Sequence, residues 1–239
     1  MDMYILFAAE WIGAVAVGMI AGLSPKFTRI KLAFKYPRRE GVVSLGVFLF
    51  AMFIALVISS IPSLALGSLS RDQSERLIVA AGSLVPVIVA LWRRKQPVRS
   101  AGWSREKLYA ALQLGMALAF FSIFLRGKFN AVITGLNSES LGLLAYCLVM
   151  ALMEETAFRG FIQPRLASWW GETAGWLAAS ALFVLCQLPR LLAVPEQLLF
   201  NLVLVVGQSL VAGYLMQRSG HVLAPALYRA VSIWLLFFA

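Results

Sequence analysis

The sequence has little of what soluble metalloenzymes and disulfide-rich domains require. Only 13% of its 239 residues are charged, one residue is histidine (His221) and two are cysteines (Cys147 and Cys186). One histidine cannot supply a site built from several imidazole ligands, and both cysteines lie in apolar runs, where we expect small buried hydrophobic residues. The low charge excludes an ordinary soluble enzyme and a disordered tail, since soluble domains are about one-quarter charged.

Hydrophobic residues, by contrast, make up 61% of the chain, and the mean hydropathy is +0.82. Because a membrane-spanning helix needs about 20 apolar residues, we predict an all-α, polytopic membrane bundle of about eight transmembrane helices. It forms a single domain over residues 1–239, with N-terminal helices in 1–140 and a core that carries the motifs in 141–238. The predicted spans are 4–23, 41–66, 77–92, 108–125, 141–164, 172–192, 197–217 and 221–238.

The net charge of +10 comes from basic residues between the apolar runs. Such residues are typical topology signals beside anionic head groups, so we expect membrane lipids and no nucleic acid as partners. Most of the 21 lysines and arginines lie in or beside odd-numbered loops, which the positive-inside rule places in the cytoplasm. The sequence contains no Asn-x-Ser/Thr site, and we expect a multi-pass protein of a bacterial inner (plasma) membrane.

Ionisable residues within the predicted spans are costly, at about 2.5–3.5 kcal/mol or more each. Glu10 lies near the outer end of the first span, and we expect an interfacial carboxylate that reaches water. Glu154 and Glu155 lie deep in a later span, where Arg159 can pair with Glu155 at a spacing of four residues. Glu154 points about 100° away and needs a partner on another helix. This segment alone supports a structural ion pair and a catalytic carboxylate pair equally.

The stretch Glu154-Glu155-Thr-Ala-Phe-Arg159-Gly resembles the first motif of the CPBP family (CAAX protease and bacteriocin-processing, or Abi), which are intramembrane metalloendopeptidases. The frames of the second and third motifs follow in order, as Phe183-Val-Leu-Cys-Gln187-Leu-Pro and as the run from Leu223 to Ile233. The resemblance covers about 141–238. It implies that a glutamate and histidines bind zinc or activate a water against a peptide bond.

This chain departs from the family at its ligand positions. Gln187 and Arg229 stand where the family has histidines, Ile233 stands where it has asparagine, and His221 lies outside the motif. Glutamine is a poor zinc ligand, and a protonated arginine repels a cation. Since Glu154 and Glu155 alone cannot build an open tetrahedral site, we expect no metal and no cofactor.

We predict instead a structural polar lock, formed by Glu154, Glu155, Arg159, Gln187 and Arg229. In it Arg229 supplies positive charge beside Glu154, and Gln187 adds a hydrogen bond. The favoured function is a non-catalytic CPBP homologue that serves as a scaffold, assembly factor or accessory subunit, with other integral membrane subunits as partners. The alternative is an active CAAX-type endopeptidase with an altered centre, in which Glu154 and Glu155 are catalytic. A transporter or channel is a third possibility, but the sequence shows no inverted repeat.

Overall fold

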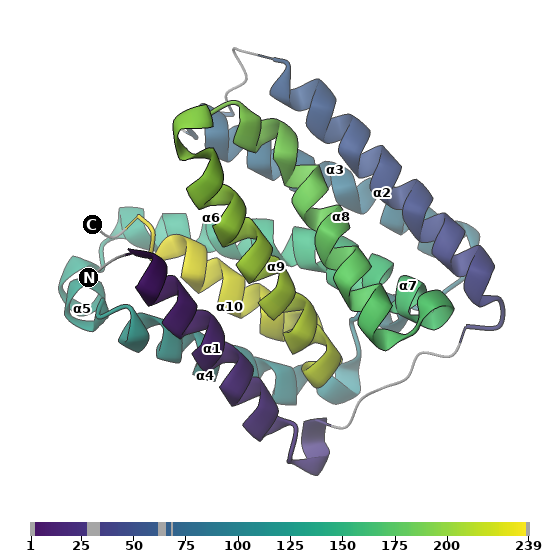
Figure 1. The fold of residues 1–239 in the computed structure, drawn as a ribbon, viewed down its shortest axis with the longest axis horizontal. Helices are drawn as coiled ribbons and strands as arrows, with labels where there is room; N and C mark the ends of the chain where they lie inside the picture. Colours follow the sequence, from purple (N-terminus) through teal and green to yellow (C-terminus); the bar gives the residue numbers. More distant parts are fainter. Residues whose placement is uncertain (1–2, 28–33, 62–65, 68, 238–239) are drawn as a thin grey trace.

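A computed structural model of the chain describes residues 3–27, 34–61, 66–67 and 69–237 (Figure 1). These residues form helices and no strand, and seven helical segments are long and apolar enough to cross a membrane. The predicted all-α, polytopic membrane bundle is therefore confirmed. The seven segments are α1 (Met3–Ala21), α2 (Pro37–Ser59), α3 (Arg71–Arg93), α4 (Leu108–Leu125), a continuous stretch containing α6 (Ser138–Glu155) and α7 (Gln163–Trp170), α8 (Glu172–Leu192) and α9 (Leu198–Ser219).

Local sequence sets several helix ends. Ser70 caps α3 by accepting a hydrogen bond from the backbone N–H of Gln73, whose side chain accepts one from the N–H of Ser70 in return. Asn137 and Ser140 form the same reciprocal pair at the start of α6. Such capping boxes satisfy backbone N–H groups that a helix leaves unpaired in its first turn.

A π-helix, Thr156–Ile162, joins α6 to α7 without a break. It begins directly after Glu155 and contains Arg159. Turns of this kind are rare and occur often at functional sites, because the wider turn changes the direction in which side chains project.

The predicted span at 221–238 is wrong in length. The structure has a shorter helix there, α10 (Leu223–Trp234), of 12 residues, which is too short to cross a bilayer. Nearly all of its residues are buried, because α4, α6 and α9 pack around it (Figure 1). A further short helix, α5 (Phe129–Gly135), was not predicted. The consequence for the site is that α10 carries Arg229 into the interior of the bundle.

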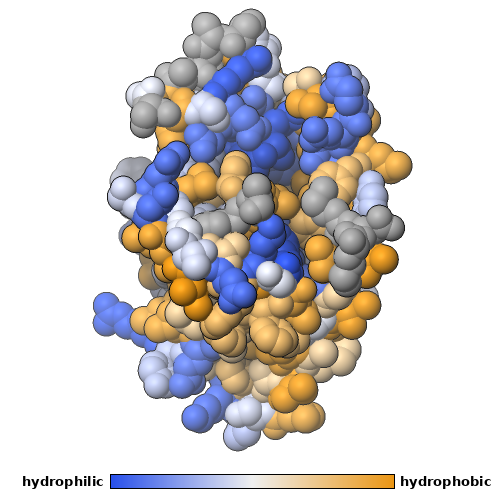
Figure 2. Space-filling model, turned by 90° about the vertical axis from the view of Figure 1, so that its left-hand side faces the viewer, coloured by the Kyte–Doolittle hydropathy of each residue, from blue (hydrophilic) through white to orange (hydrophobic). Residues whose placement is uncertain are grey.

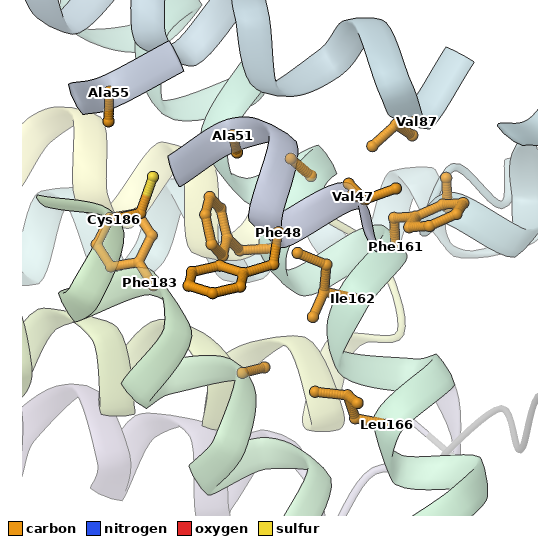
Figure 3. Packing of buried hydrophobic residues seen from close by; sticks show 14 residues of the cluster. Val47, Phe48, Ala51, Ala55, Val87, Phe161, Ile162, Leu166, Phe183 and Cys186 are labelled. Atoms are coloured by element: carbon orange, nitrogen blue, oxygen red, sulfur yellow. The ribbon is translucent and has the colours of Figure 1, made fainter. Parts of the chain in front are cut away.

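One apolar cluster joins α2, the π-helix, α7 and α8. Figure 3 shows Phe48 of α2, Ile162 of the π-helix and Phe183 of α8 packed together in this cluster. The rings of Phe158 and Phe183 meet edge to face, with centroids 5.1 Å apart. This packing fixes α8 against the segment that follows the two glutamates.

Candidate functional site

The five polar residues predicted from the motifs meet inside the bundle. Glu154 and Glu155 end α6, Arg159 lies in the π-helix, and Gln187 and Arg229 come from α8 and α10. Both glutamates and both arginines are at most 4% exposed. The structure thus brings together residues that are as much as 75 positions apart in the sequence.

Arg229 contacts both carboxylates at once. Its Nη1 donates to Oε1 of Glu155, and its Nη2 donates to Oε2 of Glu154 at 2.8 Å. Gln187 Nε2 donates to the other oxygen of Glu154, also at 2.8 Å. Both oxygens of Glu154 therefore accept a hydrogen bond, one of them from a charged, forked donor of the stronger kind.

Arg159 completes the charge balance. Its Nε lies 3.5 Å from Oε2 of Glu155, an ion-pair contact without a hydrogen bond. Its Nη2 donates instead to the backbone oxygen and hydroxyl of Ser209 in α9, at 3.1 and 2.9 Å. The spacing of four residues thus gives the expected charge contact, while the hydrogen bonds of this guanidinium go to another helix.

Phe183 lies beside both guanidinium groups. Its ring centroid is 4.5 Å from Cζ of Arg159 and 4.6 Å from Cζ of Arg229. An aromatic face attracts a cation, most strongly where water is excluded. The phenylalanine of the second motif frame therefore contributes to the site together with Gln187.

These residues do not fit a zinc ion. The two histidine positions of the family carry a carboxamide and a guanidinium, and that guanidinium occupies oxygens of both Glu154 and Glu155. Across the described ranges, no group of three or more His, Cys, Asp or Glu residues could hold a metal. A cation placed at the carboxylates would have to displace a donor that already carries positive charge.

His221 lies apart from this cluster, just before α10. It is 1% exposed, its ring packs against Trp103, and its Nδ1 accepts a hydrogen bond from the N–H of Leu223 at 3.0 Å. Burial lowers the pKa of His221 below its ordinary value. The single histidine therefore packs against Trp103, away from the cluster, and does not replace the missing ligands.

A cavity of about 270 Å³ reaches Glu154, Gln187 and Arg229. Asp72, Arg76 and Arg190 also line it, and Asp72 contacts both arginines, at 2.9 and 3.3 Å. Figure 2 shows hydrophilic side chains in a recess near the middle of one face, with apolar side chains below it and further hydrophilic groups toward the top and bottom of the view. One edge of the polar cluster is thus accessible, whereas Glu155 and Arg159 are fully buried.

A second buried network corrects the interpretation of Glu10. Glu10 is 0% exposed, not interfacial, because α1 packs against α4 and α9 and turns this carboxylate inward. Arg126, which follows α4, donates to Glu10 and also to the backbone oxygen and hydroxyl of Ser232, at 2.9 and 2.8 Å. Gln208 of α9 donates to the same hydroxyl at 3.0 Å. This network ties α1, α4, α9 and α10 together.

Arg126 and Arg165 come directly after the predicted spans 108–125 and 141–164, but both are buried. Arg165 is 0% exposed and contacts Glu40 at 3.2 Å. A signal was available for both arginines, since Glu10 and Glu40 lie inside or next to apolar runs and needed cationic partners. No comparable signal marked Ser209 or Ser232, whose hydroxyls become important only when helices pack.

The segment that carries all five residues of the site matches a known family. Residues 136–235 match the family model described as type II CAAX prenyl endopeptidase Rce1-like. This segment is Rce1-like. The match confirms, over residues 136–235, the resemblance predicted from the three motif frames, and it supports a CAAX protease-like membrane protein. No curated protein and no solved structure matches the chain. The division of the domain near residue 140 stays a prediction.

Proposed function

We propose that this chain is a non-catalytic Rce1-like membrane protein, which acts as a scaffold, assembly factor or accessory subunit for other integral membrane proteins. The proposal includes a bacterial inner membrane as its location, with the odd-numbered loops in the cytoplasm. In this proposal the five polar residues, of which all but Gln187 are buried, act as a polar lock between helices and take no part in catalysis.

The observation that carries the proposal is the fork of Arg229 between two glutamates. A general base must be within hydrogen-bond reach of the proton that it removes, whereas the oxygens of Glu154 are directed at the side chains of Gln187 and Arg229. A carboxylate pair that works without metal requires one protonated and one ionised member. The oxygens of Glu154 and Glu155 instead contact two guanidinium groups, those of Arg159 and Arg229.

The alternative is an active endopeptidase with an altered, glutamate-based centre. The cavity favours it, because Glu154 and Arg229 both line a space of about 270 Å³ that a substrate could enter. In that case Arg229 would have to move away from Glu154 during turnover, or act as a fixed positive charge in place of a metal.

Metal content and peptide cleavage separate the two functions. The purified protein is expected to hold no stoichiometric zinc and to leave a prenylated peptide uncut. The matched variant is Gln187→His/Arg229→His/Ile233→Asn, which restores the family residues and is expected to gain zinc. Adding Glu154→Gln to this variant should remove part of that gain, because zinc sites use carboxylate ligands of this type.

The proposal fails if the wild-type protein binds about one zinc per chain, or if it cleaves the peptide and Glu154→Gln abolishes the cleavage. The accessory role has its own test. The protein is purified from its native membrane with a mild detergent, and a partner must be present in fixed proportion and must lose stability when the chain is absent. If the chain is recovered without any such partner, the accessory role is wrong even where the chain is inactive.

A further inference from the structure

The cavity beside the polar cluster begins at one end of the helix bundle. Its wall includes Asp72 in the first turn of α3, Arg190 in the last turn of α8 and Asn201 in the first turn of α9. Asp72 contacts Arg190 at 3.3 Å, so the start of α3 and the end of α8 lie side by side. The cavity therefore begins where three spanning helices enter or leave the membrane.

From this end the cavity runs toward the middle of the bundle. At its mouth Asp72 and Gln197 are exposed. At its inner end Glu154, Gln208 and Arg229 are at most 6% exposed. Figure 2 views the molecule from the side on which α5 lies in Figure 1, and it shows a hydrophilic recess near the middle of this face. Ionisable residues of spanning segments face the bundle interior or a water-filled cavity, so we expect water to enter here.

Toward the opposite end of the bundle, the segment 98–103 between α3 and α4 covers the polar cluster. Trp103 donates a hydrogen bond to the hydroxyl of Thr156 in the π-helix at 3.1 Å. The backbone oxygen of Gly102 accepts one, also at 3.1 Å, from the residue that precedes α10. A Cβ at Gly160 would overlap the backbone of this segment, so the segment and the π-helix are in direct contact. The cavity, which no residue of this segment lines, thus has its mouth at the other end.

The two ends of the bundle differ in free positive charge. Most lysines and arginines lie at the end away from the cavity, including exposed ones in 34–39 and 93–107. At the cavity end Arg76 and Arg190 are partly buried and pair with Asp72. Cytoplasmic loops of membrane proteins carry the excess of lysine and arginine. The cavity end therefore faces away from the cytoplasm.

We infer that the cavity opens on the non-cytoplasmic side of the membrane, and that Glu154 is reached through it from that side. The inference rests on the membrane orientation of the proposed function and deepens that function, because a partner that enters the cavity must do so with a non-cytoplasmic segment. A prenylated peptide in the cytoplasm has no route to Glu154 through this cavity, since the segment 98–103 lies in between.

A membrane-impermeant thiol reagent tests the side of access. Cys147 and Cys186 are replaced by alanine, and single thiols are then introduced by Asn201→Cys and Val205→Cys, two positions that line the cavity. Val205 lies seven residues beyond Leu198, the start of α9, which is about 10 Å along the helix. Sealed membrane vesicles of either orientation are treated with a charged methanethiosulfonate. Thiols that escape are then labelled in denaturant with a polyethylene-glycol maleimide, which shifts the band on a gel.

Two controls report on orientation and on burial. Arg99→Cys places a thiol on an exposed residue at the opposite end of the bundle. Cys147, kept as the single thiol by Cys186→Ala, is 0% exposed and does not line the cavity. The reagent should therefore leave Cys147 unmodified in vesicles of either orientation. Size-exclusion chromatography in mild detergent shows whether each variant is folded.

Both cavity variants are expected to lose the gel shift in right-side-out vesicles, whereas Arg99→Cys should lose it only in inside-out vesicles. The inference is overturned if Val205→Cys keeps its gel shift in right-side-out vesicles while Arg99→Cys behaves as expected. Loss of the shift for Arg99→Cys in right-side-out vesicles would instead show that the proposed orientation is wrong, and the inference would fall with it. Zinc binding or peptide cleavage by the wild type would refute the non-catalytic role and leave the side of access unchanged.

Discussion

Replacing Arg229 by leucine should destabilise the protein strongly. Glu154, Glu155, Arg159 and Arg229 are all buried and together carry no net charge. The Arg229→Leu variant leaves two buried carboxylates with a single guanidinium, which lies 3.5 Å from Glu155. Breaking a buried ion pair by removing one partner costs about 3–5 kcal/mol, since the other partner stays buried without compensation.

This cost is large enough to measure reliably. For a chain of this length 1 kcal/mol changes the unfolding temperature by about 2–4 °C, so we expect a decrease of about 6–20 °C. Thermal unfolding in detergent can be followed by the fluorescence of the seven tryptophans. Size-exclusion chromatography before heating shows whether each variant starts from the folded state.

Three further variants show whether charge is the cause. Arg229→Lys keeps the charge but cannot fork between two carboxylates, so it should lose less stability than Arg229→Leu. The double variant Arg229→Leu/Glu155→Gln makes the cluster neutral again and should recover stability relative to Arg229→Leu alone. Arg99→Leu changes an exposed arginine and should stay within about 0.5 kcal/mol of wild type.

The reasoning is refuted if Arg229→Leu unfolds at the wild-type temperature. It is also refuted if the double variant is no more stable than the single one, because the loss would then come from packing and not from uncompensated charge.

Three other predictions use the same unfolding assay. Arg126→Leu leaves Glu10 buried without its cation and should cost about 3–5 kcal/mol; Arg126→Leu/Glu10→Leu should recover much of it, and no recovery would contradict the ion-pair explanation. Gly160→Ala should cost about 1–3 kcal/mol or prevent folding, because a Cβ there would overlap the backbone oxygen of Ala101, and wild-type stability would contradict this packing. Burial lowers the pKa of His221 in the folded protein, so the unfolded state takes up a proton at a higher pH than the folded state does. The free energy of unfolding should therefore decline as the pH falls below about 6.5. His221→Asn should reduce that decline.

The sequence by itself determined the class of the protein and the composition of its candidate site. Hydropathy is a local property, so runs of apolar residues gave the spanning helices without any knowledge of their neighbours. The resemblance to the motif frames of a known family likewise singled out Glu154, Gln187 and Arg229, and the family match covers that segment. Because a charge in hydrocarbon is costly, Glu10, Glu154, Glu155 and Arg159 could be recognised as unusual from the sequence.

The tertiary structure decided which charges meet. Whether Arg229 would contact one glutamate or both depends on the rotation of α10 relative to α6, and hydropathy does not encode that rotation for a helix buried on all sides. The pairing of Glu10 with Arg126, 116 residues away, depends in the same way on how α1 packs against α4. The cavity beside Glu154 likewise exists only between five packed helices, because its lining side chains come from segments far apart in the sequence that meet only when these helices pack.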